Sequence, residues 1–141
     1  MKKGAGKNVA VVGHFPFVPR LRSIAENLWV IEQHPSDGDC PARLATDLIP
    51  RADVVALTAS ALINHTLDSL LALCCPEAFV LILGPSTPLS PVLFDHGATM
   101  IAGSRVIDEA ALLRGIGQGA TFQQVTGVRL LTFTRPGVLL I

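Results

Sequence analysis

The clearest strand signal in the sequence is Phe79-Val80-Leu81-Ile82-Leu83-Gly84, an unbroken apolar run that closes on a glycine. It is too short for a helix and has no polar alternation, a pattern typical of a strand buried on both faces of a parallel sheet. Similar runs recur at nearly even spacing, at residues 8–13, 28–32, 53–58 and 99–103. These five runs predict the parallel strands of one sheet.

The stretches between these runs can form helices, at residues 20–27, 42–49, 66–75, 89–95 and 108–116. Strands that alternate with helices indicate right-handed βαβ units with helices on both faces of the sheet. Residues 128–134 alternate more than the other runs and predict a last edge strand, which could be antiparallel. The predicted fold class is therefore α/β, a three-layer Rossmann-like sandwich with a mainly parallel sheet of five or six strands. We expect residues 1–141 to form a single domain of this kind.

Composition excludes several classes of protein. Of the 141 residues, 50% are hydrophobic and 16% are charged, which excludes a disordered chain. Eleven basic residues balance eleven acidic ones, so no positive excess is available for a nucleic-acid partner. No apolar run approaches the roughly 20 residues of a membrane span, and no long apolar signal region follows the basic start. Three cysteines, two of them adjacent, do not form a disulfide pattern. We therefore predict a cytoplasmic protein without a membrane or nucleic-acid partner.

The predicted topology places the chemistry-bearing side chains at one edge of the sheet. In an open parallel sheet, every strand-to-helix loop emerges at the same edge, where ligands bind near the point at which the strand order reverses. The loops assigned to that edge follow Gly13, Glu32, Thr58 and Gly84, whereas the returning loops are poorer in polar groups. The polar residues that these loops carry are His14, Glu32, His34, Asp37, Asp39, Cys40, Thr58, Ser60, Asn64, His65, Thr66, Ser86 and Thr87. We expect a ligand site there.

The first of these loops does not match a dinucleotide fingerprint. Gly13-His14-Phe15-Pro16 supplies only the first glycine of G-x-G-x-x-G, and prolines replace the others. Glu32 nevertheless ends the second predicted strand, where an acid can bind a ribose hydroxyl. It can equally be a solvated acid at the end of a strand.

A metal site is a further possibility at the same edge. The loop from His34 to Pro41 offers an imidazole, two carboxylates and a thiol, which suit zinc, copper or nickel. The same residues can simply build a turn before a helix. No C-x-x-C or H-x-x-x-H spacing exists, so any metal site must combine loops. The candidate ligands are His14, Glu32, Asp39 and Cys40.

The loops after the third and fourth predicted strands are rich in hydroxyl groups. Asn64 and Thr66 can cap the following helix or bind a polar ligand. Ser86 and Thr87 stand in a proline-rich loop that is neither a P-loop nor a nucleophile elbow. Both loops can therefore orient a ligand through hydrogen bonds.

These blocks together resemble the family named putative heavy-metal chelation, a domain of unknown function. The matching residues extend from about 9 to 133, and the most specific blocks are residues 58–66 and 84–89. The resemblance implies a Rossmann-like carboxy-terminal domain, usually preceded by a smaller domain like the amino-terminal part of enolases. That domain is missing from this chain, so either the chain is a fragment or the partner domain is a separate enolase-like polypeptide. Exposure of the surface that the missing domain would cover also favours self-association into a homo-oligomer. The ligand-binding residues expected from the pattern and the resemblance are Gly13, His14, Phe15, Glu32, Thr58, Asn64, Thr66, Gly84, Ser86 and Thr87.

Three functions stay open at this point. The first is a domain that binds a metal ion (nickel, zinc, copper or cobalt), a metal chelate or another small molecule. The second is part of an enzyme that uses S-adenosylmethionine or a nucleotide-like cofactor. The third is a non-catalytic module that pairs with a separate enolase-like domain.

Overall fold

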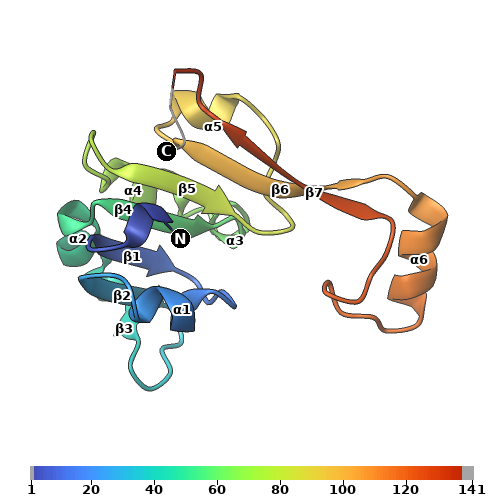
Figure 1. Cartoon of the computed structure of the whole chain (residues 1–141), viewed down its shortest axis with the longest axis horizontal. Helices are drawn as coiled ribbons and strands as arrows, with labels where there is room; N and C mark the ends of the chain where they lie inside the picture. The colour runs from blue at the N-terminus through green and yellow to red at the C-terminus, as the bar shows by residue number, and fades with distance from the viewer. Residues whose placement is uncertain (1, 138–141) are drawn as a thin grey trace.

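Seven strands form one sheet in the order β3-β2-β1-β4-β5-β6-β7 (Figure 1) in the computed structural model, which describes residues 2–137. The first six strands pair in parallel, and β7 pairs antiparallel with β6. The strands are β1 (Asn8–Val12), β2 (Asn27–Glu32), β3 (Cys40–Pro41), β4 (Val54–Thr58), β5 (Phe79–Leu83), β6 (Met100–Val106) and β7 (Val128–Thr134). The α/β fold and the mainly parallel sheet are confirmed, including the antiparallel edge strand.

The strand count is higher than the five or six expected. The additional strand is β3, which consists of Cys40 and Pro41 and pairs with Ile31 and Glu32 of β2. Two residues are too few to show any hydrophobic period, so the sequence pattern places them in a loop.

The helices are short. They are α1 (Val18–Arg22), α2 (Ala45–Leu48), α3 (Ser60–Ile63), α4 (Leu67–Ala72), α5 (Val92–Asp95) and α6 (Glu109–Gly117), with 3-10 turns η1 (Lys2–Gly4), η2 (Ala42–Leu44) and η3 (Ile49–Arg51). Each expected helix exists, but most are shorter than predicted. The helix α5 begins at Val92 instead of at residue 89, because Pro91 disfavours the helical conformation for the residue before it, Ser90.

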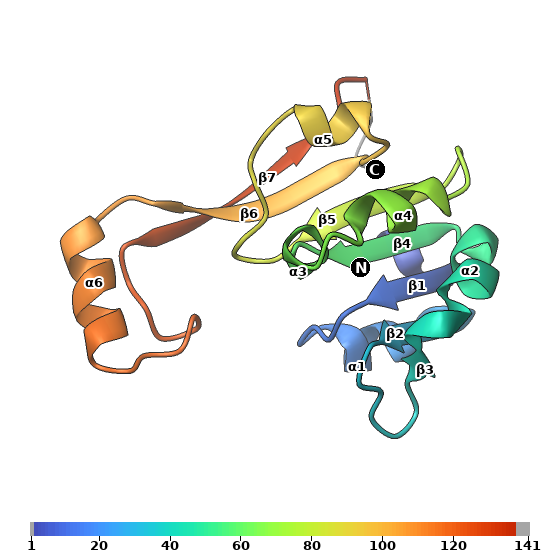
Figure 2. The same ribbon diagram turned by 180° about the vertical axis from the view of Figure 1, so that it is seen from behind.

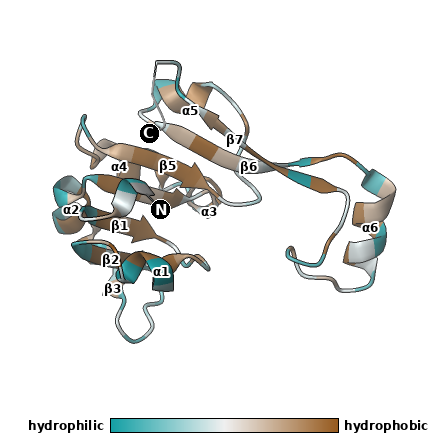
Figure 3. Ribbon diagram, in the orientation of Figure 1, coloured by the Kyte–Doolittle hydropathy of each residue, from teal (hydrophilic) through white to brown (hydrophobic). Residues whose placement is uncertain are grey.

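Both faces of the sheet pack against other parts of the chain, which explains the unbroken apolar runs, although the second face is only half-buried at β5 and β6. One face carries residues such as Val55, Ile82 and Ile101 and is covered by α2, α3, α4 and α5. On the other face, Val9 and Val11 pack with the Leu21 side chain of α1. The hydrophobic residues of the strands form the middle layer of this sandwich (Figure 3). The three-layer arrangement is therefore as expected.

The strands β6 and β7 continue beyond the rest of the sheet. The last β6 residue that pairs with β5 is Ala102, whereas β6 and β7 stay paired as far as Val106 and Val128. This two-stranded ribbon carries α6 away from the body of the molecule, as Figures 1 and 2 show from opposite sides. We call residues 104–130 the arm.

Candidate functional site

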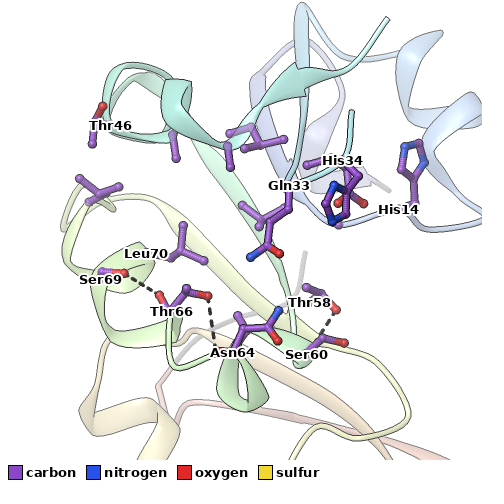
Figure 4. A pocket seen from close by; sticks show the side chains of 18 residues that line it. His14, Gln33, His34, Thr46, Thr58, Ser60, Asn64, Thr66, Ser69 and Leu70 are labelled. Atoms are coloured by element: carbon purple, nitrogen blue, oxygen red, sulfur yellow. Dashed lines mark hydrogen bonds between the residues drawn. The ribbon is translucent and has the colours of Figure 1, made fainter. Parts of the chain in front are cut away.

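A cleft of about 690 Å³ opens at the carboxyl ends of β1, β2 and β4 (Figure 4). The strand β1 lies between β2 and β4. After β1 the chain adds β2 and β3 on one side of it, and then crosses to add β4 on the other side. This is the reversal of strand order at which open α/β sheets bind ligands. The cleft therefore lies where the topology predicts a site.

Polar groups face one another across the cleft above an apolar floor. Gln33 and His34 follow β2 on one side, whereas Asn64 and Ser69 come from the α3–α4 segment on the other (Figure 4). Apolar residues also line the cleft, including Val12, Ile31, Ala45, Leu70 and Leu73. Clefts of this size, mostly apolar with a few converging polar groups, are typical small-molecule sites.

Gly13 allows the two central strands to approach each other at the base of the cleft. Its φ is +102°, a conformation that favours glycine. A Cβ atom at this position would lie 3.0 Å from the Thr58 Cβ. Its amide donates to the Ile31 carbonyl oxygen at 3.1 Å, which connects the end of β1 to β2. A side chain here would therefore disturb the base of the cleft.

His14 and Asp39 form the one ion pair that residues 2–137 contain. The distance between His14 Nε2 and Asp39 Oδ2 is 2.8 Å, and the Ser36 amide donates to the same oxygen at 2.9 Å. The Asp39 side chain is 3% exposed, covered by its neighbours at the surface, whereas that of His14 is 54% exposed. The hydrogen bond to Asp39 raises the pKa of His14, and the charges of Asp39 and Glu32 add to this effect. The hydrogen bonds from His14 and Ser36 lower the pKa of Asp39.

We predict that Asp39→Asn lowers the pKa of His14 toward its ordinary value, because the variant removes the carboxylate that stabilises the protonated ring. In the wild type, the pair is charged between the lowered pKa of Asp39 and the raised pKa of His14. Its contribution to stability is lost as pH rises through the upper value and as pH falls through the lower one. An NMR titration of the His14 ring protons measures the shift. Asp37→Asn is the matched control, and an equal effect of both variants would contradict the assignment.

The cleft brings together six of the ten expected ligand-binding residues. These are Gly13, His14, Glu32, Thr58, Asn64 and Thr66. Phe15 does not line the cleft, because its ring stacks on Phe17 at 5.1 Å and packs against the α1 face of the sheet. The other three residues stand in the loop after β5, which lies against β6 instead, as the hydrogen bond from Ser104 Oγ to the Pro85 oxygen shows.

Within that loop, Thr87 is 3% exposed, and its hydroxyl has no hydrogen-bond partner within residues 2–137. The loop is held close to the sheet by Gly103, where a Cβ would lie 2.5 Å from the Thr87 carbonyl oxygen. Gly84, Ser86 and Thr87 therefore share the carboxyl edge with the cleft without lining it.

The candidate metal ligands do not form a complete metal site in this part of the chain. No three His, Cys, Asp or Glu side chains of residues 2–137 come close enough together to hold a metal ion. His14 and Asp39 contact each other, but Glu32 contributes only a longer-range charge, and Cys40 packs against the hydrophobic core. Zinc sites in proteins have three or four protein ligands. The described residues therefore do not fit a bare ion that this chain holds by itself.

Several residues of the cleft were not expected as ligand residues from the sequence. Gln33 directly follows Glu32. Thr46 and Ser69 belong to helices α2 and α4, for which the sequence pattern predicts packing against the sheet and no ligand contact. Ser69 could have been predicted from its spacing. It follows Thr66 by three residues, and residues three apart lie on the same face of a helix. Its hydroxyl donates to the Thr66 carbonyl oxygen at 2.8 Å, so it still has free acceptor capacity.

The fold is that of a Rossmann-like α/β domain with a cleft at the reversal of its strand order. The family model described as "Putative heavy-metal chelation" (DUF364) matches residues 1–135. The chain therefore belongs to this family.

Relatives support the assignment. The uncharacterized protein MJ0500 of Methanocaldococcus jannaschii is 32% identical over 114 residues, which are 76% of this chain and 44% of that protein. A DUF364 protein of unknown function from Desulfitobacterium hafniense superposes with a TM-score of 0.84 at 32% identity, covering 95% of this chain and 55% of its own. The corresponding Pyrococcus horikoshii structure gives a TM-score of 0.76 at 21% identity, covering 91% and 55%, which shows the fold alone. The chain thus spans about half the length of these relatives.

None of the helices in the described part of the chain is long and apolar enough to pass through a membrane.

Proposed function

We propose that the cleft binds a small organic molecule that carries a metal ion, that is, a metal chelate. The family description supports a connection to heavy metals. The described residues lack a set of three metal ligands, so the remaining donors must come with the ion. The organic part would occupy the cleft, whose 690 Å³ suits a molecule of this size.

The observation that carries the proposal is the convergence of polar groups from separate elements on one cleft. Glu32 and Gln33 end the β2 wall, Thr58 ends β4, and Asn64 and Thr66 stand on the facing wall. Amide, hydroxyl and carboxylate groups in this arrangement orient a polar ligand through hydrogen bonds. His14 lies at the rim of the cleft. Its imidazole would bind the metal through one nitrogen after the hydrogen bond to Asp39 breaks.

A nucleoside-containing cofactor, such as S-adenosylmethionine or a dinucleotide, is the second candidate. Glu32 at the end of β2 and Gly13 at the end of β1 line the same cleft, the arrangement in which an acid binds ribose hydroxyls. The following segment argues against a bound pyrophosphate, because α1 has only five residues and contains Pro19. This candidate therefore ranks second.

Isothermal titration of protein stripped with a chelator separates these candidates. The probes are free nickel(II), nickel(II) citrate, nickel(II) histidine, S-adenosylmethionine and NAD. We expect a nickel chelate to bind more tightly than free nickel. Equal or tighter binding of the free ion would contradict the chelate proposal, and tight binding of the adenosine compounds alone would favour the second candidate.

We predict that Glu32→Ala weakens binding of the chelate by about tenfold or more, because a lost hydrogen bond to a charged group costs about 1.5–3 kcal/mol. The measurement is the same titration. Glu77→Ala, which changes a carboxylate before β5 at the opposite edge of the sheet, is the matched control. Unchanged binding by Glu32→Ala would exclude the cleft as the site.

A further inference from the structure

The charge of the cleft comes from one carboxylate. Glu32, at the end of β2, lines the cleft, is half-buried and forms no ion pair within residues 2–137. Asp39 lies close by, but its carboxylate is paired with His14. Among the described residues, no lysine or arginine lines the cleft, although Arg43 directly follows the lining residue Ala42. The cleft therefore has one unpaired negative charge and no fixed positive charge.

Three hydroxyl groups of the cleft are hydrogen-bond acceptors, because each donates its proton to a backbone carbonyl oxygen. Ser69 Oγ donates to the Thr66 oxygen at 2.8 Å, and Thr66 Oγ1 donates to the Ala61 oxygen at 3.4 Å. In α2, Thr46 Oγ1 donates to the Arg43 oxygen, also at 3.4 Å. A hydroxyl oxygen whose proton is used in this way still has lone pairs for a ligand. Together with Glu32, these groups make the cleft rich in acceptors.

Two carboxamides complete the polar lining without changing its charge. Gln33 and Asn64 stand on opposite walls, and their side chains point toward each other across the cleft (Figure 4). A carboxamide has both an acceptor oxygen and two N–H donors, so it can turn either group toward a ligand. These two residues therefore accommodate a ligand, whereas Glu32 and the three hydroxyls discriminate between ligands.

A ligand with many N–H groups and a positive charge matches such walls. Proteins bind carboxylates and phosphates mainly through arginine and lysine side chains, which this cleft does not have among its described residues. An anionic chelate that entered the cleft would lose its water without gaining a cationic partner. The N–H groups of metal-bound amines, in contrast, donate to carboxylate and hydroxyl oxygens, and the positive charge of such a chelate is attracted to Glu32.

We propose that the cleft selects positively charged chelates, in which amines hold the metal ion, over chelates built from carboxylates. This inference rests on the proposed function, because it assumes that a chelate occupies the cleft, and it adds the chemical class of the organic part. Glu32 determines the preference through its charge. The hydroxyl oxygens of Thr46, Thr66 and Ser69 accept the N–H groups of the ligand.

Two nickel(II) chelates that differ mainly in charge test the proposal. Triethylenetetramine and nitrilotriacetate each bind nickel through four donor atoms and leave two coordination positions open, but the first complex is doubly positive and the second is singly negative. Isothermal titration of the untagged chain with each complex and with free nickel(II) is done at about pH 8, where imidazole is ordinarily uncharged. The triethylenetetramine complex is expected to bind at least about tenfold more tightly than the nitrilotriacetate complex, and added salt should reduce this ratio.

Charge variants identify the residue that determines the ratio. Glu32→Gln keeps the shape of the side chain and removes its charge, so it is expected to lower the ratio at least about fivefold. Gln33→Lys adds a positive charge at the neighbouring exposed position and should shift the preference toward the nitrilotriacetate complex. Glu77→Gln, which removes a carboxylate before β5 at the opposite edge of the sheet, is the matched control. Circular dichroism establishes that each variant is folded.

The outcomes separate this inference from the proposed function. Equal or tighter binding of the nitrilotriacetate complex by the wild type would overturn the selection for positive charge and leave the proposed function standing. If neither complex binds more tightly than free nickel, the proposed function fails and this inference fails with it. An unchanged ratio in both Glu32→Gln and Gln33→Lys would overturn the assignment of the preference to the charge of the cleft.

Discussion

Replacing Ile82 with alanine is expected to lower the free energy of unfolding by about 2–5 kcal/mol. Ile82 lies in the middle of β5, is fully buried, and belongs to the larger hydrophobic cluster under α2, α3, α4 and α5. The variant removes three buried carbon atoms and leaves a cavity that the flanking strands β4 and β6 prevent from closing. Equilibrium denaturation in urea, followed by circular dichroism, measures the loss.

Ile63→Ala is the matched control for this prediction. Ile63 is the same residue type but is 70% exposed at the end of α3. Surface substitutions of this kind usually change stability by less than about 0.5 kcal/mol. Similar losses in the two variants would mean that Ile82 is not in the core of the sheet.

Gly103→Ala is expected to destabilise the protein by about 1–3 kcal/mol, the usual cost of an overpacked interior. The new Cβ would lie 2.5 Å from the Thr87 carbonyl oxygen and 3.0 Å from the Leu89 side chain. Thr87 itself is buried, so the loop after β5 must move away from the sheet to make room. The same urea titration measures this effect, and amide chemical shifts of the loop should change with it.

Gly117→Ala is the control that separates a steric effect from a general effect of losing glycine. Gly117 is the last residue of α6, and a Cβ there would meet no atom within 4 Å. Alanine in a helix is favoured over glycine by about 0.5–1 kcal/mol, so this variant should be as stable as the wild type or slightly more so. A loss at Gly117 as large as that at Gly103 would contradict the steric argument.

The strands could be predicted from the sequence because burial on both faces leaves an unmistakable pattern. Every apolar run from residue 8 to residue 103 is a strand, and the alternation at 128–134 belongs to the antiparallel strand β7. Helices were harder, because five of the six have only four to six residues and their ends depend on prolines and loop contacts. The helix α3 was missed for the same reason, since its four residues resemble a loop.

The sequence alone places the candidate site at the carboxyl edge of the sheet, but does not show which loops of that edge form it. Parallel strands bring their carboxyl ends to one edge, so Gly13, Glu32 and Thr58 had to lie near each other. Which of the edge loops shares a cleft depends on the strand order, and the order places β5 and β6 away from β2. The loop from Gly84 to Thr87 therefore shares the edge but lines no part of the cleft. Contacts such as that of His14 with Asp39 depend on loop geometry, which no periodicity encodes.

The two-residue strand β3 also determines where the sheet could be extended by another chain. Pro41 has no amide hydrogen, and with only one further residue the outer edge at this side offers almost no template for backbone pairing. The opposite edge, β7, is longer, but Arg129 stands within it, and Arg135 and Pro136 follow its end. Charged residues and prolines at an edge are the means by which natural sheets resist stacking into fibres. The β3 border is thus poorly suited to pairing with another chain, and at the β7 border Arg129, Arg135 and Pro136 act against such pairing.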